Sequence, residues 1–320
     1  MRVVDPIDDL QSFRLARGST ATESSAGHGF RFEFPWAIEM NVRSPRNGSI
    51  RGFAGGSASS ASHSRGSLMG RRISVFATDL DRTLIRPGRP PTATGRTALR
   101  EARAMGLRTL LVSGRQYGEL QGFARAFGEV DGIVAENGAM VEVPLGTKPT
   151  VVGLRPAASL RRRLEERGGV NARYGQVVIS VPREERRKLM AALRGLPVRV
   201  IANVDRLMVL PVGVDKWSGT RLALRRLGLA RSGYAGIGDA ETDLDLMRGA
   251  TLSGAVGNAL RDVRAAADYR CRGEFDRGVL EFVRGPLAER VRGTADRGSL
   301  SDEPRALGRA ARSGACSPPR

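Results

Sequence analysis

Hydrophobic and polar positions follow two periods in turn from Ile73 onward. Short apolar runs typical of buried strands alternate with longer segments whose apolar residues lie three and four positions apart, as on one face of a helix. Because strands and helices alternate, we expect a parallel sheet joined by right-handed crossovers. The elements predicted in this first part are the strands Ile73–Thr78, Arg108–Val112 and Gly132–Ala135, the helices Thr94–Met105, with Thr94 as its N-cap, and Tyr117–Phe127, and a turn at Asn137-Gly138.

The pattern changes between residues 149 and 212. Two strands follow each other directly around Asn203, and the alternation of strand and helix resumes only after Asp215. We interpret this segment as an inserted α+β cap domain. Its predicted elements are the helices Ala157–Arg167 and Arg183–Leu193 and the strands Gln176–Val181, Val198–Ala202 and Arg206–Leu210; those after it are the helices Ser218–Leu227, Glu241–Met247 and Leu260–Ala267 and the strands Tyr234–Ile237 and Leu252–Val256.

The sequence therefore predicts an α/β fold with two parts of different architecture. Residues 71–148 and 213–286 are expected to form a Rossmann-like core around a parallel sheet, and residues 149–212 the cap. The ends of the chain differ in composition, since residues 1–70 are rich in Gly, Ser and Arg, and residues 287–320 in Arg, Ser, Gly and Pro. Such segments bury too little apolar surface to fold, so we expect both ends to be disordered.

The chain carries a formal net charge of +19. A basic surface often indicates a nucleic-acid partner, but here nearly all the positive charge comes from arginines scattered along the chain, and the only lysines are Lys148, Lys188 and Lys216. We therefore expect no nucleic-acid partner, with an Arg-rich nucleic-acid-binding or regulatory protein as an alternative. No apolar run approaches the ~20 residues of a membrane helix, so we expect no membrane association and a cytoplasmic location.

Histidine is absent from the predicted core. His28 and His63 both lie in the N-terminal stretch, which excludes Ser-His-Asp and Cys-His hydrolases, histidine phosphatases and His-ligated metal sites. Cys271 and Arg277 have the Cys-x5-Arg spacing of cysteine phosphatases, but no histidine precedes the cysteine, and such spacing is unsurprising in an Arg-rich chain. Carboxylates and a lysine are left to carry the chemistry.

Two acidic residues stand where the first predicted strand ends. Asp79 and Asp81 lie two residues apart at the sheet edge where open α/β sheets bind their ligands. One carboxylate of such a pair can attack a substrate while the other transfers protons. An isolated Asp-x-Asp is also common in surface turns, so this assignment depends on the motifs that follow.

Three further motifs end later strands or begin later helices. Ser113 and Gly114 offer a hydroxyl and backbone N–H groups, which suit phosphate but also cap helices. Lys216 precedes a core helix and offers an ammonium group to a phosphate dianion. Asp239 and Asp243 stand four residues apart at a helix start, and carboxylates from two strand ends give Mg²⁺ the oxygen ligands it prefers.

In this order the motifs resemble those of the haloacid dehalogenase superfamily, in particular its phosphatases with an α/β cap between the second and third motifs. The similarity extends from about Ile73 to Arg284. It implies that Asp79 is the nucleophile and Asp81 the general acid and base. The other implied roles are phosphate binding by Ser113, Gly114 and Lys216, Mg²⁺ binding by Asp79, Asp81, Asp239 and Asp243, and positions near the rim of the site for Arg115, Asn137 and Asn258.

The resemblance implies a Mg²⁺-dependent phosphatase that hydrolyses a small phosphorylated metabolite, a sugar phosphate or a phosphorylated acid such as phosphoglycolate, through an aspartyl-phosphate. A phosphomutase on the same scaffold is the alternative. The chain departs from the family pattern at Arg82 and Trp217, where Gly is common, and at Thr242, where Asn is common. Cap arginines such as Arg173 either bind acidic substrate groups or form solvated faces. The sequence indicates no oligomeric state.

Overall fold

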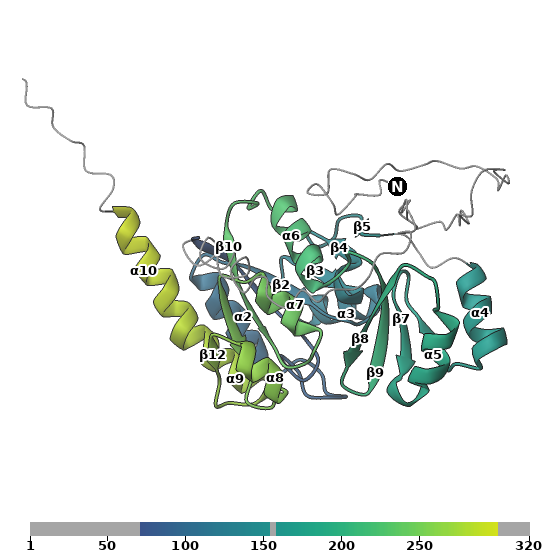
Figure 1. Ribbon diagram of the computed structural model, residues 1–320. Helices are drawn as coiled ribbons and strands as arrows, with labels where there is room; N and C mark the ends of the chain where they lie inside the picture. Colours follow the sequence, from purple (N-terminus) through teal and green to yellow (C-terminus); the bar gives the residue numbers. More distant parts are fainter. Residues whose placement is uncertain (1–70, 154–157, 300–320) are drawn as a thin grey trace, which may run out of the picture.

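The computed structural model describes residues 71–153 and 158–299, which form a larger and a smaller lobe (Figure 1). The predictions of disorder for residues 1–70 and 300–320 lie outside this part. The larger lobe contains an eight-stranded sheet and the smaller lobe a four-stranded sheet. The chain enters the smaller lobe from one edge of the large sheet and returns at a helix of the larger lobe (Figure 1).

The large sheet consists mainly of parallel strands. From one edge to the other its strands are β12 (Tyr269–Arg270), β11 (Leu252–Ala255), β10 (Gly233–Gly238), β1 (Ile73–Thr78), β2 (Arg108–Val112), β3 (Gly132–Ala135), β4 (Met140–Glu142) and β5 (Thr150–Val151). Pairing is parallel from β12 to β3 and antiparallel from β3 to β5. The central strand β1 is almost entirely buried, as is typical of a parallel sheet covered on both faces. Strand β5 lies inside the range predicted for the cap, yet it extends the core sheet.

Helices cover this sheet. They are α2 (Ala93–Ala104), α3 (Tyr117–Phe127), α6 (Lys216–Arg226), α7 (Asp243–Arg248), α8 (Arg261–Ala266), α9 (Phe275–Phe282) and α10 (Ala288–Ser299), with the π-helical turn η3 (Val283–Leu287) before α10. Thr92, rather than the predicted Thr94, caps α2, because its hydroxyl oxygen accepts a hydrogen bond from the N–H of Gly95 at 3.0 Å. The prediction of no fold beyond residue 286 was wrong for α10, since Leu287 and Val291 pack against the core.

The smaller lobe packs two helices on one face of an antiparallel sheet. Its strands, in spatial order, are β6 (Arg173–Tyr174), β7 (Ile179–Pro182), β9 (Arg206–Pro211) and β8 (Val198–Asn203), and its helices are α4 (Ala158–Gly168) and α5 (Arg186–Ala192), with the 3-10 turn η2 (Arg183–Glu185) before α5. Alternate residues point to opposite faces of a strand. Val181, Leu207 and Val209 therefore pack with Leu164 and Leu189 of the helices, while the intervening residues face the larger lobe.

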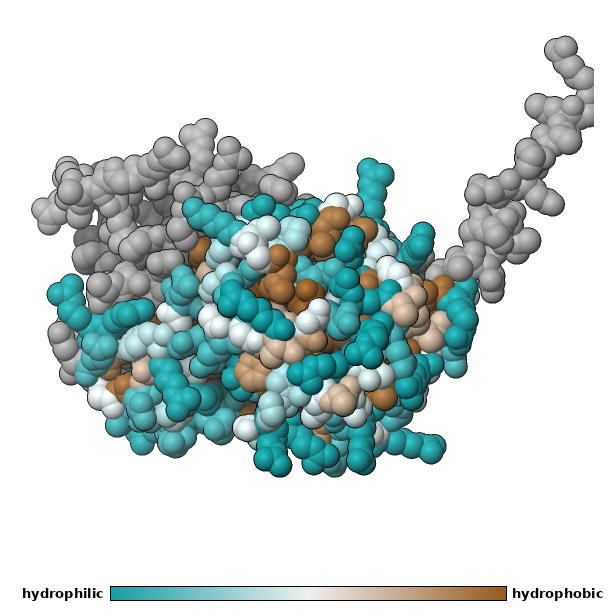
Figure 2. Space-filling model, turned by 180° about the vertical axis from the view of Figure 1, so that it is seen from behind, coloured by the Kyte–Doolittle hydropathy of each residue, from teal (hydrophilic) through white to brown (hydrophobic). Residues whose placement is uncertain are grey.

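The surface is largely hydrophilic on the face seen in Figure 2, where hydrophobic residues form small patches among polar ones. Within the described residues, the exposed large hydrophobic side chains are those of Met190 and Val212. Within residues 71–153 and 158–299, no helix is both long and apolar enough to cross a membrane.

Candidate active site

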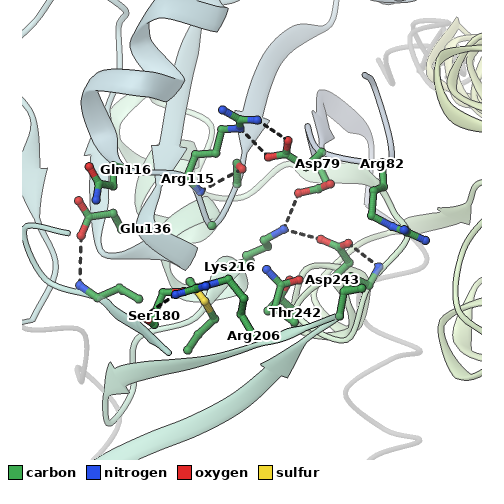
Figure 3. A pocket seen from close by; sticks show the side chains of 18 of the residues that line it. Asp79, Arg82, Arg115, Gln116, Glu136, Ser180, Arg206, Lys216, Thr242 and Asp243 are labelled. Atoms are coloured by element: carbon green, nitrogen blue, oxygen red, sulfur yellow. Dashed lines mark hydrogen bonds and ion pairs between the residues drawn. The ribbon is translucent and has the colours of Figure 1, made fainter. Parts of the chain in front are cut away.

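Three neighbouring strands of the large sheet end at one cleft. Asp79 follows β1, Ser113 follows β2 and Asp239 follows β10. This is the edge at which open α/β sheets bind ligands. The sheet of the smaller lobe faces it, and the cleft between the two lobes has a volume of about 610 Å³ (Figure 3). The structure thus brings the sequence-predicted acids to the boundary of the two lobes.

Lys216 joins two carboxylates at the floor of the cleft. Its Nζ donates hydrogen bonds to Oδ1 of Asp79 at 2.7 Å and to Oδ1 of Asp243 at 2.6 Å (Figure 3). Lys216 is the first residue of α6, whose N-cap Asp215 accepts a hydrogen bond from the N–H of Ser218. Burial opposes the charge of Lys216, but Asp243 and Asp79 outweigh burial and raise its pKa above the ordinary value. The ammonium is therefore a fixed positive charge inside the cleft.

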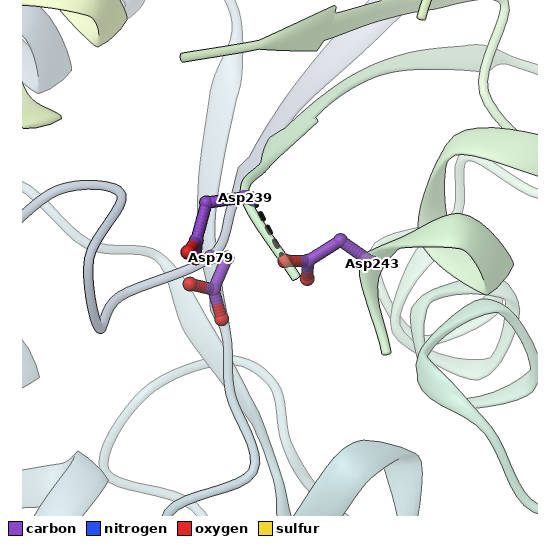
Figure 4. Close-up of side chains that lie close together, drawn as sticks. All are labelled: Asp79, Asp239 and Asp243. Atoms are coloured by element: carbon purple, nitrogen blue, oxygen red, sulfur yellow. Dashed lines mark hydrogen bonds between the residues drawn. The ribbon is translucent and has the colours of Figure 1, made fainter. Parts of the chain in front are cut away.

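Asp243 closes the turn that carries Asp239. Its Oδ2 accepts hydrogen bonds from the N–H groups of Asp239 at 2.9 Å and Ala240 at 3.0 Å (Figure 4). A Cβ on Gly238 would lie 2.3 Å from Cγ of Asp243, so only glycine allows this close approach. These contacts explain why α7 begins at Asp243 and not at Glu241, where the sequence predicted its start.

Asp79, Asp239 and Asp243 form one buried acidic cluster (Figure 4). Each offers a carboxylate oxygen within 4.8 Å of the others. Burial, followed by the charge of Asp243, raises the pKa of Asp79 well above its ordinary value, and the same two causes raise the pKa of Asp239 to about 6. The three crowded carboxylates together carry more negative charge than their neighbours neutralise, and they offer hard oxygen ligands. Such a site fits a divalent cation such as Mg²⁺.

Asp239 has two further partners that the sequence did not predict. Nε of Arg82 donates to its Oδ2 at 2.9 Å, and the hydroxyl of Thr83 donates to its Oδ1 at 3.2 Å. The φ angle of Arg82 is +61°, in the left-handed region that favours glycine. Arg82 is also one of the positions at which the sequence departs from the family pattern. Its guanidinium therefore places a second positive charge beside the acidic cluster.

Asp81 lies apart from the acidic cluster. Its two oxygens accept hydrogen bonds from Nε and Nη2 of Arg115, both at 2.7 Å. The guanidinium of Arg115 also lies 4.6 Å from the ring centroid of Phe123. The carboxylate of Asp81 is thus not brought to the other acids, and the structure gives no support to Asp81 as a side-chain metal ligand. Its side chain is 37% exposed and lines the open part of the cleft.

Ser113 and Gly114 line the cleft at the end of β2. Oγ of Ser113 accepts a hydrogen bond from the N–H of Arg115 at 3.2 Å, which leaves its hydroxyl proton available to a ligand oxygen. The structure therefore places both residues where the sequence predicted phosphate binding.

Two asparagines predicted near the rim lie behind it. Asn258 ties two loops together, because its Nδ2 donates to the carbonyl of Arg82 at 2.7 Å and its Oδ1 accepts from the N–H of Phe275 at 2.8 Å. Asn137 is fully buried against Gly114. A Cβ added to Gly114 would lie 3.2 Å from the side-chain amide of Asn137. Neither polar atom of the Asn137 amide has a hydrogen-bond partner among the described residues. Both asparagines support the turns of the cleft rather than line it.

Glu136 fastens the smaller lobe to the larger one, and the sequence did not indicate this role. Its carboxylate accepts hydrogen bonds from the backbone N–H groups of Gln176 at 2.9 Å, Val177 at 2.8 Å and Val178 at 3.1 Å. A Cβ on Gly175 would lie 2.5 Å from this carboxylate, so a larger residue there would displace the Glu136 side chain. Because these amides bind Glu136, β7 begins only at Ile179, later than the strand predicted from Gln176.

Cys271 is not a nucleophile of this cleft. It is fully buried, and it is not part of the cleft lining. Burial, followed by the charge of Glu281, raises the pKa of its thiol to about 12. The Cys-x5-Arg spacing with Arg277, which is exposed at the start of α9, is therefore a coincidence of sequence.

Comparison with known proteins identifies the family. A family model for haloacid dehalogenase-like hydrolases matches residues 76–149 and 171–283, which together exceed half of the chain. The chain belongs to this family. The matched segments include residues that line the cleft, namely Asp79, Asp81, Ser113, Lys216, Asp239 and Asp243.

The hydrolase has curated relatives of similar length to its described part. It is 26% identical over 220 residues to a phosphoglycolate phosphatase of Methanospirillum hungatei, covering 65% of this chain and 94% of the relative. It is 30% identical over 227 residues to a phosphoglycolate phosphatase of Metallosphaera sedula, covering 66% of this chain and 97% of the relative. These matches and the family model confirm that the chain is a phosphatase-type enzyme.

Solved structures share the fold of the hydrolase. A Thermoplasma acidophilum protein superimposes with a TM-score of 0.58 at 16% identity, covering 67% of this chain and 97% of its own. A sugar phosphatase of haloacid dehalogenase subclass IIB gives a TM-score of 0.54 at 20% identity, covering 66% of this chain and 98% of its own. The predicted α/β fold, with a parallel core sheet and a second sheet as the cap, is thereby confirmed.

Proposed function

We propose that the hydrolase is a Mg²⁺-dependent phosphatase that removes the phosphoryl group from a small phosphate monoester through a covalent intermediate on Asp79. The observation that carries this proposal is the buried ammonium of Lys216 between Asp79 and Asp243 at the edge of the sheet. Neither a surface turn nor a helix cap explains a buried cation among buried carboxylates, because burying such charges is costly. Relatives named phosphoglycolate phosphatase support the same reaction class.

Asp79 supplies the nucleophile in this mechanism. One of its carboxylate oxygens attacks phosphorus in line with the ester oxygen, and the bond from phosphorus to the leaving oxygen breaks as the bond to Asp79 forms. The leaving oxygen takes a proton from Asp81. A water molecule then attacks phosphorus, gives a proton to Asp81, and releases inorganic phosphate while Asp79 is restored.

Arg115 controls the position of Asp81. Both oxygens of Asp81 accept hydrogen bonds from this guanidinium, which fixes the carboxylate at the open side of the cleft. Each oxygen keeps a second lone pair that can bind a proton, so Asp81 can transfer a proton to or from a substrate oxygen while Arg115 holds it. We therefore assign Arg115 as a positioning residue for the general acid and base.

The residues that would hold the metal are Asp79, Asp239 and Asp243. When bound, Mg²⁺ supplies positive charge that stabilises the negative charge of the transferring phosphoryl group. Lys216 adds a second positive charge from the floor of the cleft, and the hydroxyl group of Ser113 donates a hydrogen bond to a phosphate oxygen.

The substrate in this proposal is a small phosphorylated metabolite. The cleft, at about 610 Å³, lies in the range typical of small-molecule sites, and the second sheet closes one side of it. Sugar phosphates and phosphorylated acids both fit this description. A cytoplasmic location stays a prediction.

Substitution of the nucleophile tests the proposal. Asp79→Asn should lower the Mg²⁺-dependent release of phosphate from p-nitrophenyl phosphate by about 1,000-fold or more, because an amide oxygen is a poor nucleophile. Asp262→Asn is the matched control. It makes the same chemical change at an exposed position on α8, away from the cleft. Full activity of Asp79→Asn would contradict the assignment. Free phosphate as the product distinguishes a phosphatase from a phosphomutase.

A further inference from the structure

The cap side of the cleft carries two arginines that form no ion pair with a carboxylate of the described residues. On the core side, every cation in the cleft lining has an acidic partner, and these pairs are Arg82 with Asp239, Arg115 with Asp81, and Lys216 with Asp79 and Asp243. Arg173 and Arg206 line the cleft from the cap. Among the described residues, neither of them forms an ion pair with a carboxylate.

The register of the cap sheet brings these two arginines to one face. Arg173 of β6 pairs with Ser180 of β7, and Ser180 pairs with Met208 of β9. Arg206 lies two residues before Met208 on the same strand, so its side chain points to the same side of the sheet. The opposite face of the sheet packs against α4 and α5. Arg173 and Arg206 therefore share the face that lies over the acidic cluster.

Arg206 is held in place along this face. Its Nε donates to Oγ of Ser180, and its Nη2 donates to the carbonyl oxygen of Ser180 at 2.9 Å (Figure 3). Its Nη1 has no hydrogen-bond acceptor within the described chain. Burial, followed by the like charge of Arg173, lowers the pKa of Arg206, whereas the hydrogen bond to Asp81 is the main cause that raises the pKa of Arg115. Arg206 is thus a partly buried cation that feels the charges of Asp205, Glu184 and Glu185 but forms no ion pair with any of them.

We propose that Arg206, with Arg173 beside it, binds a second anionic group of the substrate. The cleft then takes phosphate monoesters whose leaving group carries a carboxylate or a further phosphate. The transferring phosphoryl group lies at Lys216 and the acidic cluster, and the second anion lies at the cap. A guanidinium suits this role, because its N–H groups can pair with two oxygens of one carboxylate or phosphate. This inference rests on the proposed phosphatase function and specifies its substrate class.

The test compares small phosphate monoesters whose leaving groups differ in charge. 2-Phosphoglycolate carries a carboxylate, 1,3-propanediol bisphosphate a second phosphate, and 2-hydroxyethyl phosphate no second charge. Arg206→Gln should lower kcat/KM for at least one of the two anionic substrates by about 10- to 100-fold, the worth of a charged hydrogen bond. Activity toward 2-hydroxyethyl phosphate should stay within about threefold. The anionic substrate that loses more identifies the group that Arg206 binds.

Arg187→Gln is the control, because Arg187 is exposed on α5 and the substitution changes the net charge of the cap equally. Its kcat/KM should match the wild type for all three substrates. An equal loss on all three substrates in Arg206→Gln, or no loss on any, would overturn the proposal.

A binding measurement separates this proposal from the phosphatase function. Calorimetry with phosphonoacetate and ethylphosphonate, which cannot be hydrolysed as esters, should show tighter binding of phosphonoacetate to the wild type and no such preference in Arg206→Gln. If the wild type shows this preference without hydrolysing any ester, the anion subsite stands and the phosphatase function fails. If the wild type hydrolyses esters but neither the kinetics nor binding depends on the second anion, only the subsite fails.

Discussion

Asp239 carries an energetic cost in the folded protein. Burial and the neighbouring Asp243 raise its pKa to about 6 from an ordinary value of 3.8, although Arg82 opposes the shift. Because the folded pKa is the higher one, the folded state binds the proton more tightly than the unfolded chain. Ionised Asp239 therefore destabilises the fold above about pH 6, and protonation relieves this cost as the pH falls toward 4.

Removing this charge should stabilise the metal-free enzyme. At neutral pH without divalent metal, we expect Asp239→Asn to raise the free energy of unfolding by about 1–3 kcal/mol, and the difference to vanish as the pH falls through about 6 toward 4. Mg²⁺ should raise the Tm of the wild type but not of the variant, which lacks a ligand. Calorimetry over this pH range measures both effects. A variant that is less stable at neutral pH, or that Mg²⁺ stabilises equally, would contradict this account.

Single residues of the site differed in how far the sequence could predict them. Asp79 and Asp239 could be predicted, because a carboxylate directly after a buried strand is a local pattern with a known position in the fold. The ion pair of Arg82 with Asp239 joins residues 157 apart. Glu136 likewise binds amides 40 to 42 residues away. The first pairing depends on how strands far apart in the sequence lie side by side in the core, and the second on how the two lobes pack, so no local pattern reveals either of them.

At the scale of elements, side-chain acceptors decide where several helices and strands begin. Strand β7 begins late because three preceding amides bind Glu136 instead of a neighbouring strand, and α7 begins late because Asp243 binds the amides of the preceding turn. Hydrophobic periodicity predicted these elements but not their first residues. The periodicity reports which face is buried, whereas the ends depend on where each backbone N–H finds an acceptor.

The hydrogen bonds of Glu136 give a prediction for the attachment of the cap. In Glu136→Gln a neutral amide replaces the charged acceptor, so the N–H groups of Gln176, Val177 and Val178 should exchange with solvent about 10-fold faster or more. Hydrogen–deuterium exchange measures this directly. Glu274→Gln is the control, since Glu274 is exposed and makes no side-chain hydrogen bond at the start of α9. Unchanged exchange over residues 176–178 would show that Glu136 does not hold the cap.

At the scale of the whole molecule, the two lobes divide the chemistry between them. The core sheet supplies Asp79 and the acidic cluster, and the cap sheet supplies Arg206 on the opposite wall of the cleft. The alternation of strands and helices predicted the core sheet, and the break in that alternation between residues 149 and 212 predicted the cap. Which face of the cap lies over the cleft could not be predicted, since it depends on contacts between the lobes.

Mass spectrometry of the enzyme quenched with acid during turnover tests the central claim most directly. With Mg²⁺ and p-nitrophenyl phosphate, the wild type should carry one phosphoryl group on the peptide that contains Asp79, because the covalent intermediate forms there before water attacks. Borohydride should reduce the phosphorylated Asp79 and no other residue. The Asp79→Asn variant should carry no phosphoryl group. Steady turnover with no phosphorylated peptide, or a phosphoryl group on a residue other than Asp79, would contradict the account.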